Sequence, residues 1–91
     1  MENAVHLHVS GEVQGVGYRY WARSTAARLG LRGWVRNLDD GRVELLAAGP
    51  AAVLDQFVDD CRMGPGAAKV EEVVVRDIEA PSLLSSFQIH A

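Results

Sequence analysis

The sequence is short of the features that mark disulfide-stabilised, secreted and membrane-spanning chains. Its 91 residues include one cysteine, Cys61, so no disulfide forms within the chain and a reducing compartment is expected. No apolar run approaches the roughly 18 residues that a membrane helix needs. The first residues have neither the basic segment nor the apolar core of a signal peptide. We therefore expect a cytoplasmic protein that forms a single domain over residues 1–91.

The chain also lacks a surplus of positive charge. Nine Lys and Arg residues face twelve Asp and Glu residues, which gives a formal net charge of −3. A nucleic-acid backbone favours a basic surface, and an RNA-binding sheet also needs aromatic side chains on adjacent strands. We expect no nucleic-acid partner and no membrane partner. With 48% hydrophobic residues, the chain can still bury a core.

The apolar pattern predicts a short chain of alternating strands and helices. Val5, Leu7 and Val9 alternate with polar residues, as in a half-buried strand. Asp40–Gly41 is typical of a hairpin turn, and Pro50 suits the first turn of a helix. The later elements are expected as a helix over 19–29, strands over 31–38 and 42–49, a helix from 50 to Gly64, a strand over 69–78 and a short edge strand at 87–90.

This order, βαββαβ with a possible fifth strand, is that of an α+β, ferredoxin-like sandwich. We expect two helices on one face of a mainly antiparallel sheet. The split first unit places the first two strands parallel, with the third expected between them. The right-handed crossover rule leaves few other ways to wind the chain.

The stretch "GEVQGVGYR", residues 11–19, links the first strand to the first helix and contains three glycines. A helix N-terminus offers unpaired N–H groups and the positive end of the helix dipole, and both suit an anion. Glycines let successive N–H groups converge, and Arg19 adds a fork of donors that matches phosphate oxygens. The stretch lacks the Gly-Lys-Ser/Thr ending of a P-loop and the third glycine of a dinucleotide fingerprint.

A second polar residue is expected to reach the same place. The predicted helix carries the chain away by about 16 Å at 1.5 Å per residue. The second strand returns it by roughly 20 Å at about 3.3 Å per residue. Asn37, at the end of that strand, should therefore lie near Arg19 and the glycine loop. An Asn before a turn also commonly bonds its own backbone, which is the alternative interpretation.

The sequence shows no cluster with metal-ligand spacing. His6 and His8 share one side of a strand, but no third ligand is evident, so we expect a solvated face and no metal. Cys61 lies on the apolar stripe of a helix and is expected in the core. Asp39, Asp40 and Glu44 are interpreted as a hairpin turn with a solvated flank.

Two long stretches, residues 11–19 and "GWVRNLDDGRVELLAAG" at 33–49, resemble the signature stretches of the acylphosphatase family. The likeness extends to "LGLRGW" (29–34), the second helix and the closing "FQI". It implies an acylphosphatase-like domain that hydrolyses acyl phosphates to a carboxylate and inorganic phosphate. It also implies that Arg19 and Asn37 are the catalytic pair and that backbone N–H groups of the loop bind the phosphate. The loop residues concerned are Gln14, Gly15, Val16, Gly17, Tyr18 and Arg19.

The chemistry of the substrate fits these residues. The leaving carboxylate is a weak base, so no general acid has to protonate it, and catalysis depends on positioning and on neutralising charge. We therefore expect a monomeric, metal-independent hydrolase without a cofactor that acts on a small-molecule acyl phosphate. The alternative is a non-enzymatic, anion-binding or effector-binding ferredoxin-like module, which would use the phosphate loop but would leave Asn37 without a role.

Overall fold

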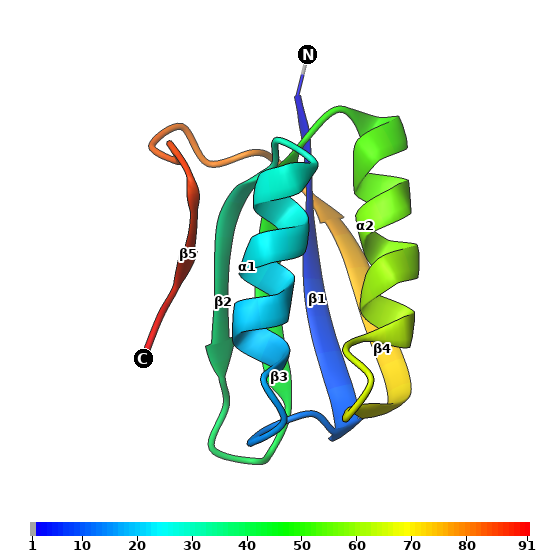
Figure 1. The fold of residues 1–91 in the computed structure, drawn as a ribbon. Helices are drawn as coiled ribbons and strands as arrows, with labels where there is room; N and C mark the ends of the chain where they lie inside the picture. Colours follow the sequence, from blue (N-terminus) through cyan, green and yellow to red (C-terminus); the bar gives the residue numbers. More distant parts are fainter. Residues whose placement is uncertain (1) are drawn as a thin grey trace.

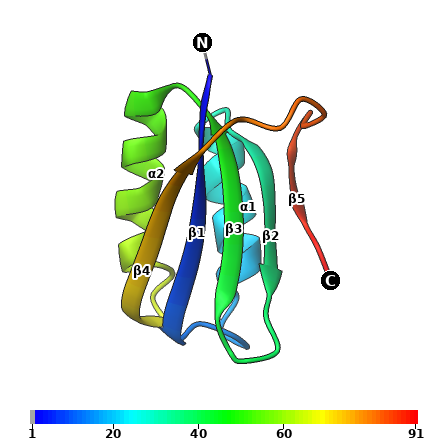
Figure 2. The same ribbon diagram turned by 180° about the vertical axis from the view of Figure 1, so that it is seen from behind.

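The computed structural model describes residues 2–91 and contains two helices and one five-stranded sheet. The helices lie side by side on one face of the sheet (Figure 1), and the opposite face is uncovered (Figure 2). The ferredoxin-like prediction is confirmed, including the fifth strand. The elements are β1 (Asn3–Glu12), α1 (Tyr18–Arg28), β2 (Arg32–Asn37), β3 (Val43–Gly49), α2 (Ala51–Met63), β4 (Lys69–Ile78) and β5 (Phe87–Ile89).

The sheet has the order β4-β1-β3-β2-β5, so β3 lies between β1 and β2 as expected. All neighbours are antiparallel except β2 and β5, which are parallel. Val9 of β1 and Asn37 of β2 both pair with Val43 of β3, which places them at the same level of the sheet. The ends of β1 and β2 therefore meet at one edge, where the β1–α1 loop and the β2–β3 turn lie together in both views (Figures 1 and 2).

The core fills the space between the helices and the covered face of the sheet. The alternation seen in the sequence is reproduced, because Leu7 and Val9 are fully buried and His6 and His8 lie on the other face. Each fully buried large apolar side chain contributes about 1.5–3 kcal/mol relative to an exposed one. Neither helix within residues 2–91 is long and apolar enough to cross a membrane.

Several ends of the elements differ from the expected ones by one residue. Helix α1 begins at Tyr18, one residue earlier than expected, because Gly17 takes the N-cap position in a left-handed conformation. Pro50 is the N-cap of α2 and not its first helical residue, and its carbonyl accepts hydrogen bonds from the N–H groups of Val53 and Leu54. The glycine at position 64 ends α2, as the sequence predicts.

Tyr18 ties the start of α1 to the end of α2. Its side chain is 1% exposed, and its hydroxyl donates a 2.7 Å hydrogen bond to the carbonyl oxygen of Cys61. That carbonyl would normally accept the N–H four residues later, but Pro65 stands there and has no N–H. The phenol of Tyr18 therefore supplies the donor that Pro65 lacks.

We predict that Tyr18→Phe lowers the free energy of unfolding by about 1–2 kcal/mol, because it leaves a buried carbonyl without a donor. The measurement is urea denaturation. Tyr20→Phe is the matched control, since Tyr20 is 63% exposed and its loss of a hydroxyl should change little. Equal denaturation midpoints for Tyr18→Phe and the unmodified chain would contradict this role.

Candidate active site

The β1–α1 loop has the backbone shape of an anion-binding site. Gly15 and Gly17 have φ values of 74° and 81°, whereas Val16 between them has an ordinary negative φ, since no residue other than glycine has a positive one in the described chain. Such an alternation turns successive N–H groups toward one concave side. A Cβ atom at either glycine would meet nothing within 4 Å, so the backbone conformation and not crowding requires glycine.

The backbone N–H groups of this loop donate to no backbone carbonyl among the described residues. The first backbone hydrogen bond into α1 runs from the N–H of Trp21 to the carbonyl of Gly17. Among residues 2–91, no backbone carbonyl accepts the N–H groups of residues 14–20. These donors lie before α1 and in its first turn, at the positive end of the helix dipole, where they favour a negatively charged ligand.

Arg19 is the second residue of α1 and is half-buried. Its Nη1 donates a 3.2 Å hydrogen bond to the carbonyl of His90, whose own N–H donates to Val35 of β2. The end of the chain thus holds the guanidinium beside β2. In the described residues this is its one hydrogen bond, so the remaining N–H groups can bind an anion. No sequence pattern marks this contact, because a backbone carbonyl forms it.

Gln14 connects the loop to the β2–β3 turn. Its side-chain Nε2 donates to the carbonyl of Leu38 at 2.7 Å and to that of Arg42 at 2.9 Å. The same turn is closed by the N–H of Leu38, which donates to the carbonyl of Arg42 at 2.8 Å. The turn that follows Asn37 is therefore fixed directly to the proposed phosphate loop. The sequence predicted Gln14 for its backbone N–H and did not reveal this side-chain role.

Asn37 ends β2, as predicted, and directly precedes Leu38, whose carbonyl accepts a hydrogen bond from Gln14 of the loop. Its Oδ1 is buried and has no hydrogen-bond partner among residues 2–91. The side-chain oxygen of Asn37 therefore does not accept a hydrogen bond from its own backbone, which was the alternative interpretation. A buried polar atom without a partner costs about 1–3 kcal/mol, and such a cost is common where an atom serves a ligand.

The predictions for Cys61 and Asp40 are confirmed. Cys61 is fully buried, and burial raises the pKa of its thiol to about 12, so it belongs to the core as expected and is not a nucleophile. Asp40 lies in the turn as expected, where its carboxylate accepts hydrogen bonds from the N–H and the Nε of Arg42. These bonds lower the pKa of Asp40.

The prediction that His6 and His8 have no third ligand is wrong. Glu44 of β3 lies opposite His8, and one of its oxygens is 2.7 Å from His6 Nε2 and 3.5 Å from His8 Nε2. Glu44 is also not on a solvated flank, since the residue is 8% exposed. Burial favours a higher pKa for Glu44, but hydrogen bonds from Arg36 and His6 outweigh it and lower the pKa. Burial, followed by the electrostatic effects of the His6 imidazole and the Arg42 guanidinium, lowers the pKa of His8.

Glycines with positive φ before a helix, N–H groups that no backbone carbonyl among residues 2–91 accepts, and an arginine in the first turn are typical of proteins that bind phosphate. The family model for acylphosphatases matches residues 5–89. This chain belongs to the acylphosphatase family.

Individual relatives agree with this assignment. An acylphosphatase from Trichormus variabilis is 48% identical over 85 residues, which cover 93% of this chain and 83% of the relative. The crystal structure of an acylphosphatase from Bacillus subtilis is similar with a TM-score of 0.94, 38% identity and full coverage of both chains. An acylphosphatase structure from Coxiella burnetii has a TM-score of 0.93 and 37% identity, and covers 98% of this chain and 93% of that one. The resemblance seen in the sequence is confirmed, and no comparison favours the effector-binding alternative.

We predict that Gln14→Ala weakens the binding of inorganic phosphate by about tenfold, because the loop is then no longer held against the β2–β3 turn. Isothermal titration with phosphate measures the effect. Gln56→Ala is the matched control, since Gln56 bonds only Asp60 on the exposed side of α2. Unchanged phosphate affinity in a folded Gln14→Ala variant would show that the loop keeps its shape without this link.

Proposed function

We propose that this chain hydrolyses acyl phosphates, with the phosphoryl group held by the β1–α1 loop and Arg19 and the attacking water held by Asn37. Water attacks phosphorus, the bond between phosphorus and the bridging oxygen breaks, and the products are a carboxylate and inorganic phosphate. The observation that carries the proposal is the buried, unpaired Oδ1 of Asn37 beside the loop. It is an acceptor without a protein partner, and a water molecule can donate to it.

The loop and Arg19 supply the positive potential. Phosphoryl transfer passes through a loose transition state whose charge is spread over three oxygens, so catalysis depends on fixed donors and on alignment. The N–H groups of Gln14, Gly15, Val16, Gly17, Tyr18 and Arg19 are the proposed phosphate ligands. The side chain of Tyr18 is turned into the core, so only its N–H can take part. The guanidinium of Arg19 adds a two-pronged contact that a lysine would not reproduce.

No proton donor is required for the leaving group. A carboxylate is stable as an anion near neutral pH, and the proton lost by the attacking water ends on the phosphate product. Asn37 is neutral and acts by orienting the water, not by removing its proton. Because Arg19 and backbone donors neutralise the phosphoryl charge, we propose that the hydrolysis of this anhydride proceeds without a metal ion or another cofactor.

The same site also bears on the oligomeric state, the class of ligand and the location of the protein. All the residues proposed for it come from one chain, from the β1–α1 loop, the start of α1 and the end of β2, so a monomer with a single domain is sufficient. The proposed ligand is a small-molecule acyl phosphate, and the mechanism needs no nucleic acid or membrane. The single, buried cysteine fits the reducing conditions of the cytoplasm.

We predict that Asn37→Ala lowers kcat by about 10²–10³-fold and leaves the inhibition constant of inorganic phosphate nearly unchanged. The reason is that the water-holding contact acts in the transition state, whereas the loop and Arg19 bind phosphate in both states. The measurement is steady-state hydrolysis of an aryl acyl phosphate with phosphate as a competitive inhibitor.

Arg19→Lys is the contrasting variant, because it should weaken both turnover and phosphate inhibition. A thermal melt accompanies each variant, since an asparagine at a strand end can also contribute about 1 kcal/mol to stability. A folded Asn37→Ala variant with normal turnover would contradict the water-positioning role and favour a site that only binds anions.

A further inference from the structure

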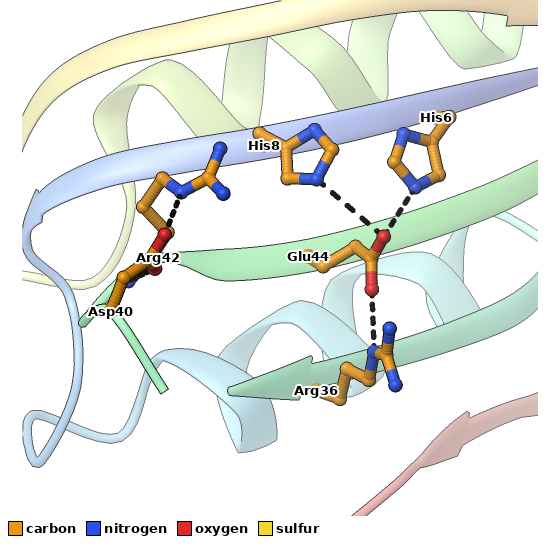
Figure 3. Close-up of polar contacts among 6 residues, drawn as sticks. All are labelled: His6, His8, Arg36, Asp40, Arg42 and Glu44. Atoms are coloured by element: carbon orange, nitrogen blue, oxygen red, sulfur yellow. Dashed lines mark hydrogen bonds and ion pairs between the residues drawn. The ribbon is translucent and has the colours of Figure 1, made fainter. Parts of the chain in front are cut away.

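The uncovered face of the sheet carries a group of side chains that the proposed hydrolysis does not use. We name His6, His8 and Glu44 the His–Glu cluster. The two histidines are two residues apart on β1 and therefore point to the same face, and Glu44 faces them from the adjacent strand β3. Figure 3 shows both imidazoles directed at one carboxylate. The loop and Arg19 belong to the helix-covered side and the end of the sheet.

The donor atoms of the cluster converge. His6 Nε2 and His8 Nε2 lie 2.7 Å and 3.5 Å from the same oxygen, Oε2 of Glu44, and all three ligand atoms lie within 4.8 Å of one another. The side chains are 19%, 24% and 11% exposed, so they are partly shielded but open to solvent on one side. Two imidazoles and one carboxylate with an open side form the donor set of known three-ligand zinc sites.

The spacing is close to that which a tetrahedral ion requires. Zinc lies about 2.0–2.2 Å from nitrogen and oxygen ligands, so two ligand atoms on the same ion are roughly 3.4 Å apart. The His8–Glu44 distance of 3.5 Å already has this value. The His6–Glu44 pair, at 2.7 Å, must open by less than 1 Å. Because a neutral imidazole can carry its proton on Nδ1, Nε2 can become a ligand without any change in net charge.

A second layer of contacts orients the carboxylate. Arg36 of β2 donates through Nε to Oε1 of Glu44 at 2.5 Å, which leaves Oε2 toward the histidines (Figure 3). The guanidinium of Arg36 in turn lies 5.6 Å from the centre of the Trp34 ring. A ligating carboxylate that is itself hydrogen-bonded is the usual arrangement around a bound metal.

Positive charges around the cluster limit how strongly it can hold a cation. Arg36 is paired with Glu44, and Arg42 is paired with Asp40. The positive charges of Arg42 and of Arg76 on β4 also contribute to the lowered pKa of His8. These charges do not occupy the donor atoms, but they raise the energy of a dication there. They therefore favour an exchangeable ion over a permanently bound one. Hard ions such as Mg²⁺ are disfavoured because they need several oxygen ligands and the cluster holds one carboxylate.

We propose that the His–Glu cluster is a binding site for one late first-row divalent ion, with Zn²⁺ as the reference ion and a water molecule in the fourth position. Imidazole and carboxylate ligands also suit Ni²⁺ and Cu²⁺, whereas Mg²⁺ is disfavoured. The ion would bridge β1 and β3, two neighbouring strands of the sheet. It would not contact the proposed phosphate site, so the proposal is independent of how acyl phosphates are hydrolysed.

The test is isothermal titration of the chelator-treated, full chain with ZnCl₂, with MgCl₂ as the negative ion. We expect saturable binding of one Zn²⁺ per chain and no binding of Mg²⁺. His8→Gln should weaken Zn²⁺ affinity by about tenfold or more. Loss of a residue that only hydrogen-bonds a metal ligand already costs about tenfold, and His8 is a proposed ligand itself. His90→Gln is the matched control, since it removes the only other histidine and should leave the affinity within about twofold.

The ring resonances of the three histidines give a second readout that does not depend on any variant. Zn²⁺ should shift the imidazole signals of His6 and His8 in NMR spectra and leave those of His90 in place. The proposal is overturned if Zn²⁺ does not saturate at one ion per chain, if His8→Gln binds it as tightly as the unmodified chain, or if the His90 ring is the one that shifts.

Discussion

Two hydrogen bonds from one amide, the side chain of Gln14, join the two halves of the proposed active site. They run to carbonyls that are 24 and 28 residues further along the chain, at the turn that follows Asn37. Each bond contributes only about 1 kcal/mol to stability. Their larger effect is geometric, because they fix the distance between the phosphate loop and the residue proposed to hold the water.

The topology of the sheet makes this junction possible. The right-handed crossover through α1 returns β2 parallel to β1, and β3 fills the place between them. Both strand ends therefore open onto one edge, where loops can hold a ligand on a rigid support. The glycines allow the loop the left-handed φ values that it adopts, so the proposed phosphate ligands can converge without backbone strain.

The order of helices and strands and the glycine loop could be predicted from the sequence, because both depend on local patterns of residues. The placement of Asn37 near the loop followed from the rise per residue of one helix and one strand. The His–Glu cluster was missed because Glu44 reaches His8 only through the pairing of two strands that are distant in the chain. The hydrogen bond that orients Arg19 was missed because its acceptor is the backbone carbonyl of His90. Every residue has such a carbonyl, so no sequence pattern indicates which one is used.

We propose that backbone N–H groups, Arg19 and Asn37 are sufficient for the hydrolysis of an acyl phosphate. This can be measured as the rate at which the purified chain hydrolyses benzoyl phosphate in excess EDTA. We expect full turnover with the chelator present and competitive inhibition by inorganic phosphate. Hydrolysis that stops with EDTA and returns with Mg²⁺, or no hydrolysis above the uncatalysed rate, would contradict it.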